Sequence, residues 1–435
     1  MEYLPNILFA IILVVGIGFF AKNVKKLVRN IKLGHDVNVS DNKSQRWKNM
    51  AMIALGQSKM VRRPVAGFLH IVVYLGFVII NIEVLEIIID GILGTHRIFS
   101  FIGSFYGFLI GSFEILALLV FVAVIVFWIR RNIIKLQRFW KSEMTSWPKN
   151  DANFILYFEM VLMTLFLVMN ATDVHFQTMN SGNIISQHIV PLFGNLEEST
   201  FHIIERTAWW IHIIGILIFL NYLYFSKHLH ILLAFPNTFY GKLTPNGQFN
   251  NLEAVTKEVK LMMDPNVDPF AAPAEGTAND IPAKFGASDV QDLNWVQLLN
   301  AYTCTECGRC TSECPANQTG KKLSPRKIMM DTRDRLEEVG KNMDTNNGEF
   351  KDDGKQLLDD YISREELWAC TSCNACVEAC PISIDPLSII LEMRRYLVME
   401  QSAAPLELNN MMANIENNGA PWPYNQMDRL NWKNE

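Results

Sequence analysis

The sequence predicts an all-α membrane bundle of five transmembrane helices, followed by a mostly α-helical domain. Three observations carry this prediction: five long apolar stretches in the first half, a change in charge near residue 235, and eight cysteines confined to the second half. Of the 435 residues only 19% are charged, against about 25% in ordinary soluble domains. Residues 1–235 carry a net charge of +6 and residues 236–435 a net charge of −11. An acidic polar half argues against a nucleic-acid partner, which would need a basic patch there.

The five apolar stretches are long enough to cross the membrane, because about 20 helical residues span roughly 30 Å of hydrocarbon. They lie near residues 5–21, 65–90, 100–129, 152–172 and 207–226. Buried helices of a soluble protein are the alternative, but the segment 116–128 is apolar on every face. The first stretch has no basic residue before it and no small-residue cleavage site after it, so we expect a helix that is retained in lipid and not a cleaved signal.

Basic residues in the loops predict the orientation, because cytoplasmic loops are enriched in Lys and Arg. Segment 22–63 holds 11 Lys/Arg and segment 130–149 holds six, whereas residues 1–6 and 173–205 hold none. The N-terminus is therefore expected outside and the cysteine-containing half in the cytoplasm, at the inner (cytoplasmic) membrane of a bacterium or archaeon.

Histidines at matching depth indicate a haem b site. His70 lies near the start of the second stretch and His230 is expected to end the fifth, both on the inner side, where two imidazoles could hold one haem iron. His212 and His230 are 18 residues apart, which at about 100° per residue places them on one helix face, about 27 Å apart. His228 would face elsewhere. The alternative is an interfacial histidine bonded to a headgroup or to backbone.

A second haem is left open. His212 would need a partner on the second stretch, where Asn81 is on the expected face but is a poor iron ligand. His175, at a similar depth, could substitute, and a five-coordinate haem or no second haem is equally compatible. Carboxylates in the membrane half could take protons from a quinol, or could simply be satisfied by neighbouring helices: Glu83, Glu86, Asp90, Glu114, Glu159 and Asp173.

All eight cysteines fall in two identical C-x2-C-x2-C-x3-C-P runs, the spacing of two-cluster bacterial ferredoxins, in which the fourth cysteine ligates the other cluster. A disulfide framework would need an oxidising compartment, and zinc sites would leave the third and fourth cysteines unexplained. The runs therefore predict two [4Fe-4S] clusters. Cluster 1 is assigned to Cys304, Cys307, Cys310 and Cys380, and cluster 2 to Cys370, Cys373, Cys376 and Cys314.

The predicted domains are a transmembrane cytochrome b domain (1–235), a linker (236–290), a dicluster ferredoxin-like domain (291–400) and a tail (401–435). Segment 264–284 contains four prolines and is expected to be extended chain. The 55 residues between the cysteine runs (315–369) are helical in character at 325–339 and 355–367.

Segments of both halves of the chain resemble known protein families. The segments 209–212 (WWIH) and 226–230 (SKHLH) resemble the cytochrome b (gamma) subunit of respiratory nitrate reductase and that of membrane-bound heterodisulfide reductase. The segments 304–310 (CTECGRC) and 323–326 (LSPR) resemble the iron–sulfur subunit of heterodisulfide reductase that carries two [4Fe-4S] clusters. The resemblance implies that His70 and His230 hold the inner haem. It implies that the outer haem would use His212 and a second-helix histidine that is missing here.

The tail resembles a connector that leads, in fused relatives, into a cysteine-rich domain. The resemblance therefore implies a separate cysteine-rich partner, similar to the cysteine-rich subunit of heterodisulfide reductase. A disordered terminus is the alternative, but Pro421, Trp422 and Trp432 suit a docking segment better.

The expected function is electron transfer between the quinone pool (menaquinone or another quinone), haem b, the two clusters and the cytoplasmic partner. No nucleophile, acid–base pair or nucleotide loop points to substrate chemistry by the chain itself. One alternative is a haem-free membrane polyferredoxin that reduces metal ions or proteins during oxidase assembly. Another is an iron–sulfur redox sensor.

Overall fold

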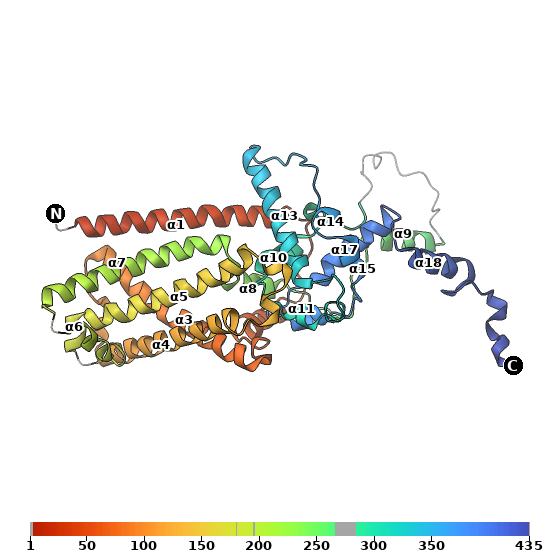
Figure 1. Cartoon of the computed structure of the whole chain (residues 1–435). Helices are drawn as coiled ribbons and strands as arrows, with labels where there is room; N and C mark the ends of the chain where they lie inside the picture. The colour runs from red at the N-terminus through yellow and green to blue at the C-terminus, as the bar shows by residue number, and fades with distance from the viewer. Residues whose placement is uncertain (1–2, 180, 195, 266–283, 435) are drawn as a thin grey trace.

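The structure, a computed structural model, describes residues 3–434 except 180, 195 and 266–283. A bundle of long helices carries the N-terminus, and a smaller helical domain is attached to one end of it (Figure 1). The described residues contain isolated β-bridges but no strand. The predicted fold class is therefore confirmed.

Among the described residues, five helices are long and apolar enough to cross a membrane, as predicted. They are α1 (Leu4–Ile31), α3 (Pro64–Leu93), α4 (Ser104–Asn132), α5 (Trp147–Thr172) and α7 (Glu198–Tyr222). Both α3 and α5 have a proline in the first turn, where the missing N–H costs no hydrogen bond. Helices α3, α4, α5 and α7 pack in that order, and α1 lies along α3 and α7.

Glycines allow α3 to approach its neighbours closely. A Cβ added at Gly76 would lie 2.3 Å from the Cγ2 atom of Val120 on α4, and one at Gly91 would lie 2.6 Å from the ring of Phe9 on α1. Small residues at helix contacts are typical of membrane bundles, because lipid tails provide no hydrophobic drive for helices to associate.

The fifth helix does not continue to His230, and this part of the prediction was wrong. Helix α7 ends at Tyr222, Ser226 is extended, and a new helix α8 (His230–Phe239) begins at His230. The buried carboxylate of Asp151 on α5 stabilises the break: Oδ1 accepts hydrogen bonds from the Tyr222 and Ser226 hydroxyls at 2.6 Å each, and Oδ2 accepts one from the Lys227 N–H at 3.1 Å. The helix-phase argument for His212 and His230 therefore does not hold.

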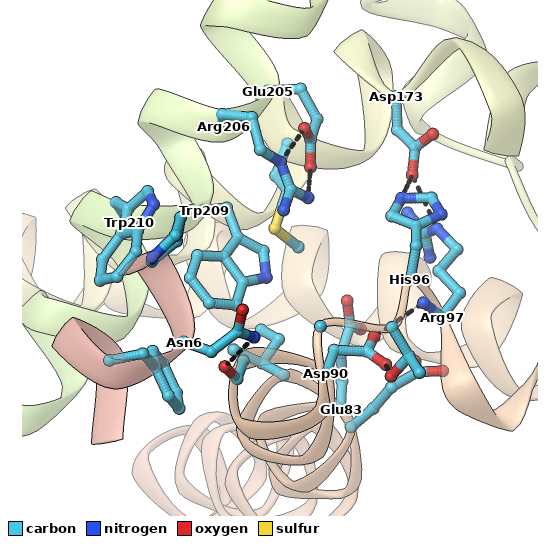
Figure 2. A pocket seen from close by; sticks show the side chains of 18 residues that line it. Asn6, Glu83, Asp90, His96, Arg97, Asp173, Glu205, Arg206, Trp209 and Trp210 are labelled. Atoms are coloured by element: carbon cyan, nitrogen blue, oxygen red, sulfur yellow. Dashed lines mark hydrogen bonds and ion pairs between the residues drawn. The ribbon is translucent and has the colours of Figure 1, made fainter. Parts of the chain in front are cut away.

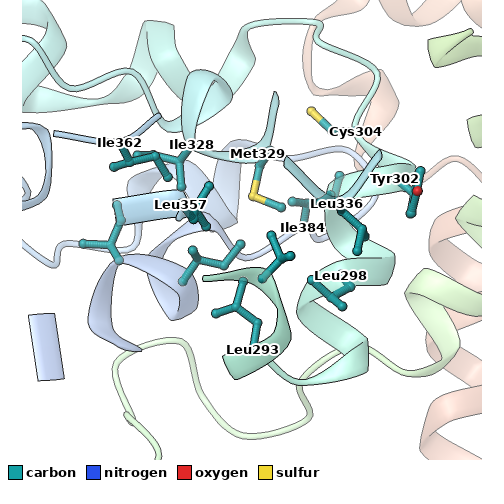
Figure 3. Close-up of a cluster of buried hydrophobic side chains, with 14 of the residues drawn as sticks. Leu293, Leu298, Tyr302, Cys304, Ile328, Met329, Leu336, Leu357, Ile362 and Ile384 are labelled. Atoms are coloured by element: carbon teal, nitrogen blue, oxygen red, sulfur yellow. The ribbon is translucent and has the colours of Figure 1, made fainter. Parts of the chain in front are cut away.

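The second domain is built on α10 (Trp295–Thr303), α13 (Pro325–Thr345) and α17 (Pro386–Met399). Its core contains Leu298, Leu336 and Ile384, together with Cys304 of the first cysteine run (Figure 3). The same core continues into the end of the bundle through Leu27 and Phe219. The two domains therefore share one apolar interior.

Within the insert, the helix predicted over 325–339 is present as part of α13, but a helix over 355–367 is not. That segment forms α14 (Leu357–Asp360) and α15 (Arg364–Trp368), because Leu358 is extended and Asp359 has a φ of +72°.

The predicted linker 236–290 contains the end of α8 and the helix α9 (Glu253–Met263). Most of its proline-rich part, 264–284, lies outside the described residues. The tail contains α18 (Leu406–Asn418) and a 3-10 helix, Gln426–Lys433.

Candidate metal and cofactor centre

The two cysteine loops have the same backbone design. Cys304 directly follows α10, and the second and fourth residues after it, Glu306 and Gly308, have φ of +54° and +70°. The second loop repeats this pattern after Cys370, with φ of +56° at Ser372 and +59° at Asn374. Residues with positive φ at alternate positions curl each loop, as expected of a backbone that wraps around a group at its centre. Short helices then follow, α11 (Arg309–Glu313) and α16 (Ala375–Ala379).

The cysteines gather in two groups, each drawing on both runs. The four residues predicted for cluster 2 share one small cavity with the apolar side chains of Leu323, Leu387 and Ile390; they are Cys314, Cys370, Cys373 and Cys376. In the other group, burial raises the pKa of Cys310 well above its ordinary value, and the neighbouring thiolates of Cys307, Cys304 and Cys380 add to the shift, with a smaller effect from Cys376. Each group therefore contains the fourth cysteine of the opposite run.

The chemistry of these groups fits iron–sulfur clusters. All eight cysteines are free thiols. Burial raises the pKa of Cys304 to about 12, so a buried thiolate there needs a cation to compensate its charge. Iron supplies that charge, since metal ligation requires deprotonated cysteine.

A buried ion network joins the first cysteine loop to the bundle. Glu306, 3% exposed, forms ion pairs with Lys227 and, at 2.8 Å, with Arg333. Burial opposes the ionisation of Glu306, but Lys227 and Arg333 outweigh it and hold the pKa of Glu306 below its ordinary value. Burial lowers the pKa of Lys227, and the carboxylates of Glu306 and Asp151 offset part of that shift. The loop is thereby attached to the break between α7 and α8.

Further contacts place the first cysteine loop at the start of α3. The Arg309 guanidinium donates to the Met60 carbonyl at 3.3 Å, and Arg63 pairs with Glu313 at 2.7 Å. The buried Arg326 side chain of α13 pairs with Glu143 at 2.7 Å. The loop of cluster 1 therefore faces the bundle. The residues that it contacts, Met60 and Arg63, lie a few positions before His70 in the sequence.

His70 and His230 lie opposite each other at this end of the bundle. Their ring centroids are 6.5 Å apart and their planes are tilted by 43°. Two imidazoles on opposite sides of one metal ion, each with a nitrogen about 2 Å from it, have centroids about 6 Å apart. The Nδ1 atom of His230 lies 3.1 Å from the Lys227 carbonyl, which can only accept, so Nδ1 carries the proton and Nε2 is free to ligate. Within the described chain the buried Nδ1 atom of His70 has no hydrogen-bond partner. The pair fits a bis-histidine haem.

Of the other histidines, His228 lies beside the pair and does not face elsewhere as expected, whereas His212 and His175 lie apart from it. His228 packs its ring on Phe219 at 5.5 Å and on His230 at 5.4 Å. His212 is buried, its ring 6.3 Å from that of Phe166. His175 is exposed at the start of α6 (Val174–Thr178) and contacts His96; among the described residues no ring contact joins it to His212. Asn81 is exposed on α3, and its neighbour Ile80 is buried.

Four of the six carboxylates in the membrane half line one cavity, and Glu114 and Glu159 do not. Glu114 accepts hydrogen bonds from Asn170 and from two backbone N–H groups, so neighbouring elements satisfy it. Glu159 lies on α5. The others line one cavity at the end of the bundle away from the cluster domain: Glu83, Glu86, Asp90 and Asp173. Sequence reasoning missed the network of Lys227, Glu306 and Arg333. The available signal was Lys227, a lysine that lies between the candidate ligands His212 and His230 in the sequence.

Comparison with known proteins supports the cysteine part of this site. Residues 303–384 match the 4Fe-4S dicluster domain. Together with the five apolar helices, this match indicates a membrane protein with a 4Fe-4S dicluster domain, and the homologues of the chain are iron–sulfur oxidoreductases.

Three relatives are informative. The chain is 28% identical to the probable iron-sulfur-binding oxidoreductase FadF of Bacillus subtilis, over 99% of this chain and 61% of that protein. It is 24% identical to the EtfAB:quinone oxidoreductase of Syntrophomonas wolfei, over 92% and 55%. It is 34% identical to one subunit of the ferredoxin/F(420)H(2)-dependent CoB-CoM heterodisulfide reductase of Methanosarcina acetivorans, over 25% and 52%.

The chain thus spans roughly three fifths of the length of the first two relatives. The predicted resemblance to the heterodisulfide reductase proteins is confirmed. No solved structure matches the chain.

Proposed function

We propose that the protein transfers electrons between the quinone pool, a haem b held by His70 and His230, the two [4Fe-4S] clusters, and a cytoplasmic cysteine-rich iron–sulfur partner. The observation that carries the proposal is the histidine pair, 6.5 Å between ring centroids, at the end of the bundle that faces the cysteine loops. When bound, the haem and the clusters supply one-electron chemistry.

The chain's own residues hold and orient these groups. The Lys227 carbonyl orients the His230 ring through Nδ1, and Lys227 also pairs with Glu306 in the loop of cluster 1. One residue therefore contacts a proposed haem ligand and the proposed cluster loop. The buried apolar core shared by the two domains includes Leu229, next to His230, and Cys304 of that loop.

The remaining parts of the proposal rest on the sequence and the relatives. The basic residues of segments 22–63 and 130–149 favour a cytoplasmic cluster domain. The name EtfAB:quinone oxidoreductase supports exchange with a quinone. Similarity to a heterodisulfide reductase subunit supports further iron–sulfur proteins as partners, and the exposed Trp422 and Trp432 of the tail suit such a contact.

The proposal is tested by the haem and iron content of the purified chain, with reduced-minus-oxidised spectra. We expect about eight non-haem irons, from two four-iron clusters, and haem b with a bis-histidine spectrum. His70→Ala and His230→Ala should each abolish that spectrum, because each removes one axial ligand, and His228→Ala is the matched control that should retain it.

Two results would contradict the proposal. Eight irons without haem would favour the haem-free polyferredoxin. Loss of haem in His228→Ala but not in His230→Ala would show that the wrong histidine of the SKHLH segment has been assigned.

A further inference from the structure

A cavity of about 330 Å³ lies at the end of the bundle away from the cluster domain, among α1, α3, α5 and α7 (Figure 2). Small-molecule sites commonly have volumes of roughly 300–1,000 Å³. The cavity is therefore large enough for one ring system, and it lies within segments that cross the membrane.

One wall of the cavity is aromatic. The ring of Phe9 lies 5.4 Å from Trp209 and 6.0 Å from Trp210, and the two indoles are 5.2 Å apart. Ile87 and Met169 add apolar surface. Such a wall suits a flat, uncharged ring.

The charged groups around the cavity are mostly paired with one another. Asp173 pairs with Arg97 at 2.7 Å and with His96 at 3.1 Å, and Glu205 pairs with Arg206. His96, Asp173 and Glu205 offer ligand atoms within 4.8 Å of one another. However, each of the two carboxylates already has an arginine partner, so the group favours a neutral ligand over a metal cation.

Glu83 is the exception. It lines the cavity with only 3% of its surface exposed, and its buried Oε2 atom has no hydrogen-bond partner in the described residues. Its neighbour Glu86 differs, because it accepts hydrogen bonds from the Phe99 N–H and the Tyr106 hydroxyl. A buried polar atom without a partner is costly, and a ligand that hydrogen-bonds to Glu83 would remove that cost.

We propose that this cavity binds the ring of a quinone, and that Glu83 exchanges a proton with one ring oxygen. This inference rests on the proposed function and adds the site and the membrane face. Oxidation of a quinol breaks two O–H bonds and releases two protons and two electrons. The Glu83 carboxylate takes one proton, and the imidazole of His96, whose side chain is 42% exposed, takes the other and passes it to solvent. Reduction of a quinone reverses both transfers.

The electrons move into the bundle, one at a time, to the haem of the proposed function. His212 is a candidate ligand on that route, because it follows Trp209 by one turn of α7 and is 2% exposed.

The first experiment compares Glu83→Gln with Glu159→Gln in the full chain. Glu159 is the matched control, since it is a membrane carboxyl that does not line the cavity. The measurements are the rate at which a short-chain naphthoquinol reduces the protein, and the equilibrium binding of the corresponding naphthoquinone. General acid–base groups contribute about 10²–10⁴-fold to rates, so Glu83→Gln should slow reduction by about 100-fold while still binding the quinone. Glu159→Gln should match the wild type. Wild-type rates in Glu83→Gln would overturn the inference.

A second experiment uses the unmodified protein, so it does not depend on folding of the variant. A photoreactive azido-naphthoquinone should label peptides containing residues 83–97 or 205–210, and unlabelled naphthoquinone should compete. Labelling at the opposite end, beside His70, would overturn this inference and leave the proposed function intact. A wild-type chain that carries both clusters and exchanges no electrons with quinol would overturn the proposed function, and this inference with it.

Discussion

Lys227 is the residue on which the two halves of the molecule depend most directly. Its side chain is 8% exposed, and its ammonium group pairs with Glu306 and lies 3.8 Å from Asp151. Its carbonyl accepts the hydrogen bond that orients His230. Removing the ammonium leaves buried carboxylates with fewer cations, and uncompensated buried charge is strongly destabilising.

Lys227→Met should therefore lower the free energy of unfolding by about 3–5 kcal/mol, the cost typical of breaking a buried ion pair. The measurement is thermal unfolding of the purified chain in detergent. Lys322→Met is the control, because Lys322 pairs with Glu365 on the surface, where both side chains are more than 60% exposed, and it should melt with the wild type. Equal melting of the two variants would contradict a structural role for Lys227.

At the scale of the element, the break between α7 and α8 gives His230 its position. Residues 223–229 contain neither proline nor glycine, so local sequence gives no reason to end the helix there. The hydrogen bonds that stabilise the break come from Asp151, which lies 71–76 residues earlier in the chain. A tertiary contact has overridden local propensity.

Asp151→Asn should disturb the break, because an amide has only one oxygen to accept the three hydrogen bonds that the carboxylate accepts. We expect His230 to lose its fixed orientation, which should broaden or reduce the bis-histidine haem spectrum while the iron content stays at the wild-type value. Asp36→Asn is a suitable control at an exposed site. An unchanged spectrum in Asp151→Asn would show that other contacts hold α8.

This element marks the limit of what the sequence predicts. Apolar length was sufficient for the five membrane helices, and cysteine spacing was sufficient for a dicluster domain, because both signals are local. The pairing of Lys227 with Glu306 and the exposure of Asn81 depend on how helices rotate and pack, which no local pattern encodes. The pairing of His70 with His230 was expected from depth, although the continuous helix assumed for it is absent.

At the scale of the whole molecule, the two cysteine groups differ in their surroundings. The loop of Cys304 to Cys310 contacts the bundle through Arg309 and Glu306. In the other group Cys373 is exposed. In the proposed assignment, cluster 1 therefore lies on the bundle side, and cluster 2 lies beside the solvent-exposed Cys373.

An iron chelator with an oxidant should accordingly remove iron in two phases, with about half lost early, since each four-iron cluster carries half of the iron. Alkylation after the first phase should modify Cys373 before Cys304, because buried thiols react slowly. Peptide mapping of the alkylated protein identifies the order. Early modification of Cys304 would mean that cluster 1 is the accessible one.

The length of the bundle also has an electrical meaning. With a quinone site at one end and the cysteine groups at the other, each electron that passes between them crosses the membrane potential, which is worth about 2.3 kcal/mol per charge per 100 mV. In the proposed orientation, electrons entering from the outer face move toward the negative side, so quinol oxidation becomes harder as the membrane charges, and quinone reduction becomes easier. A voltage applied across a proteoliposome therefore acts as a control on the direction of turnover.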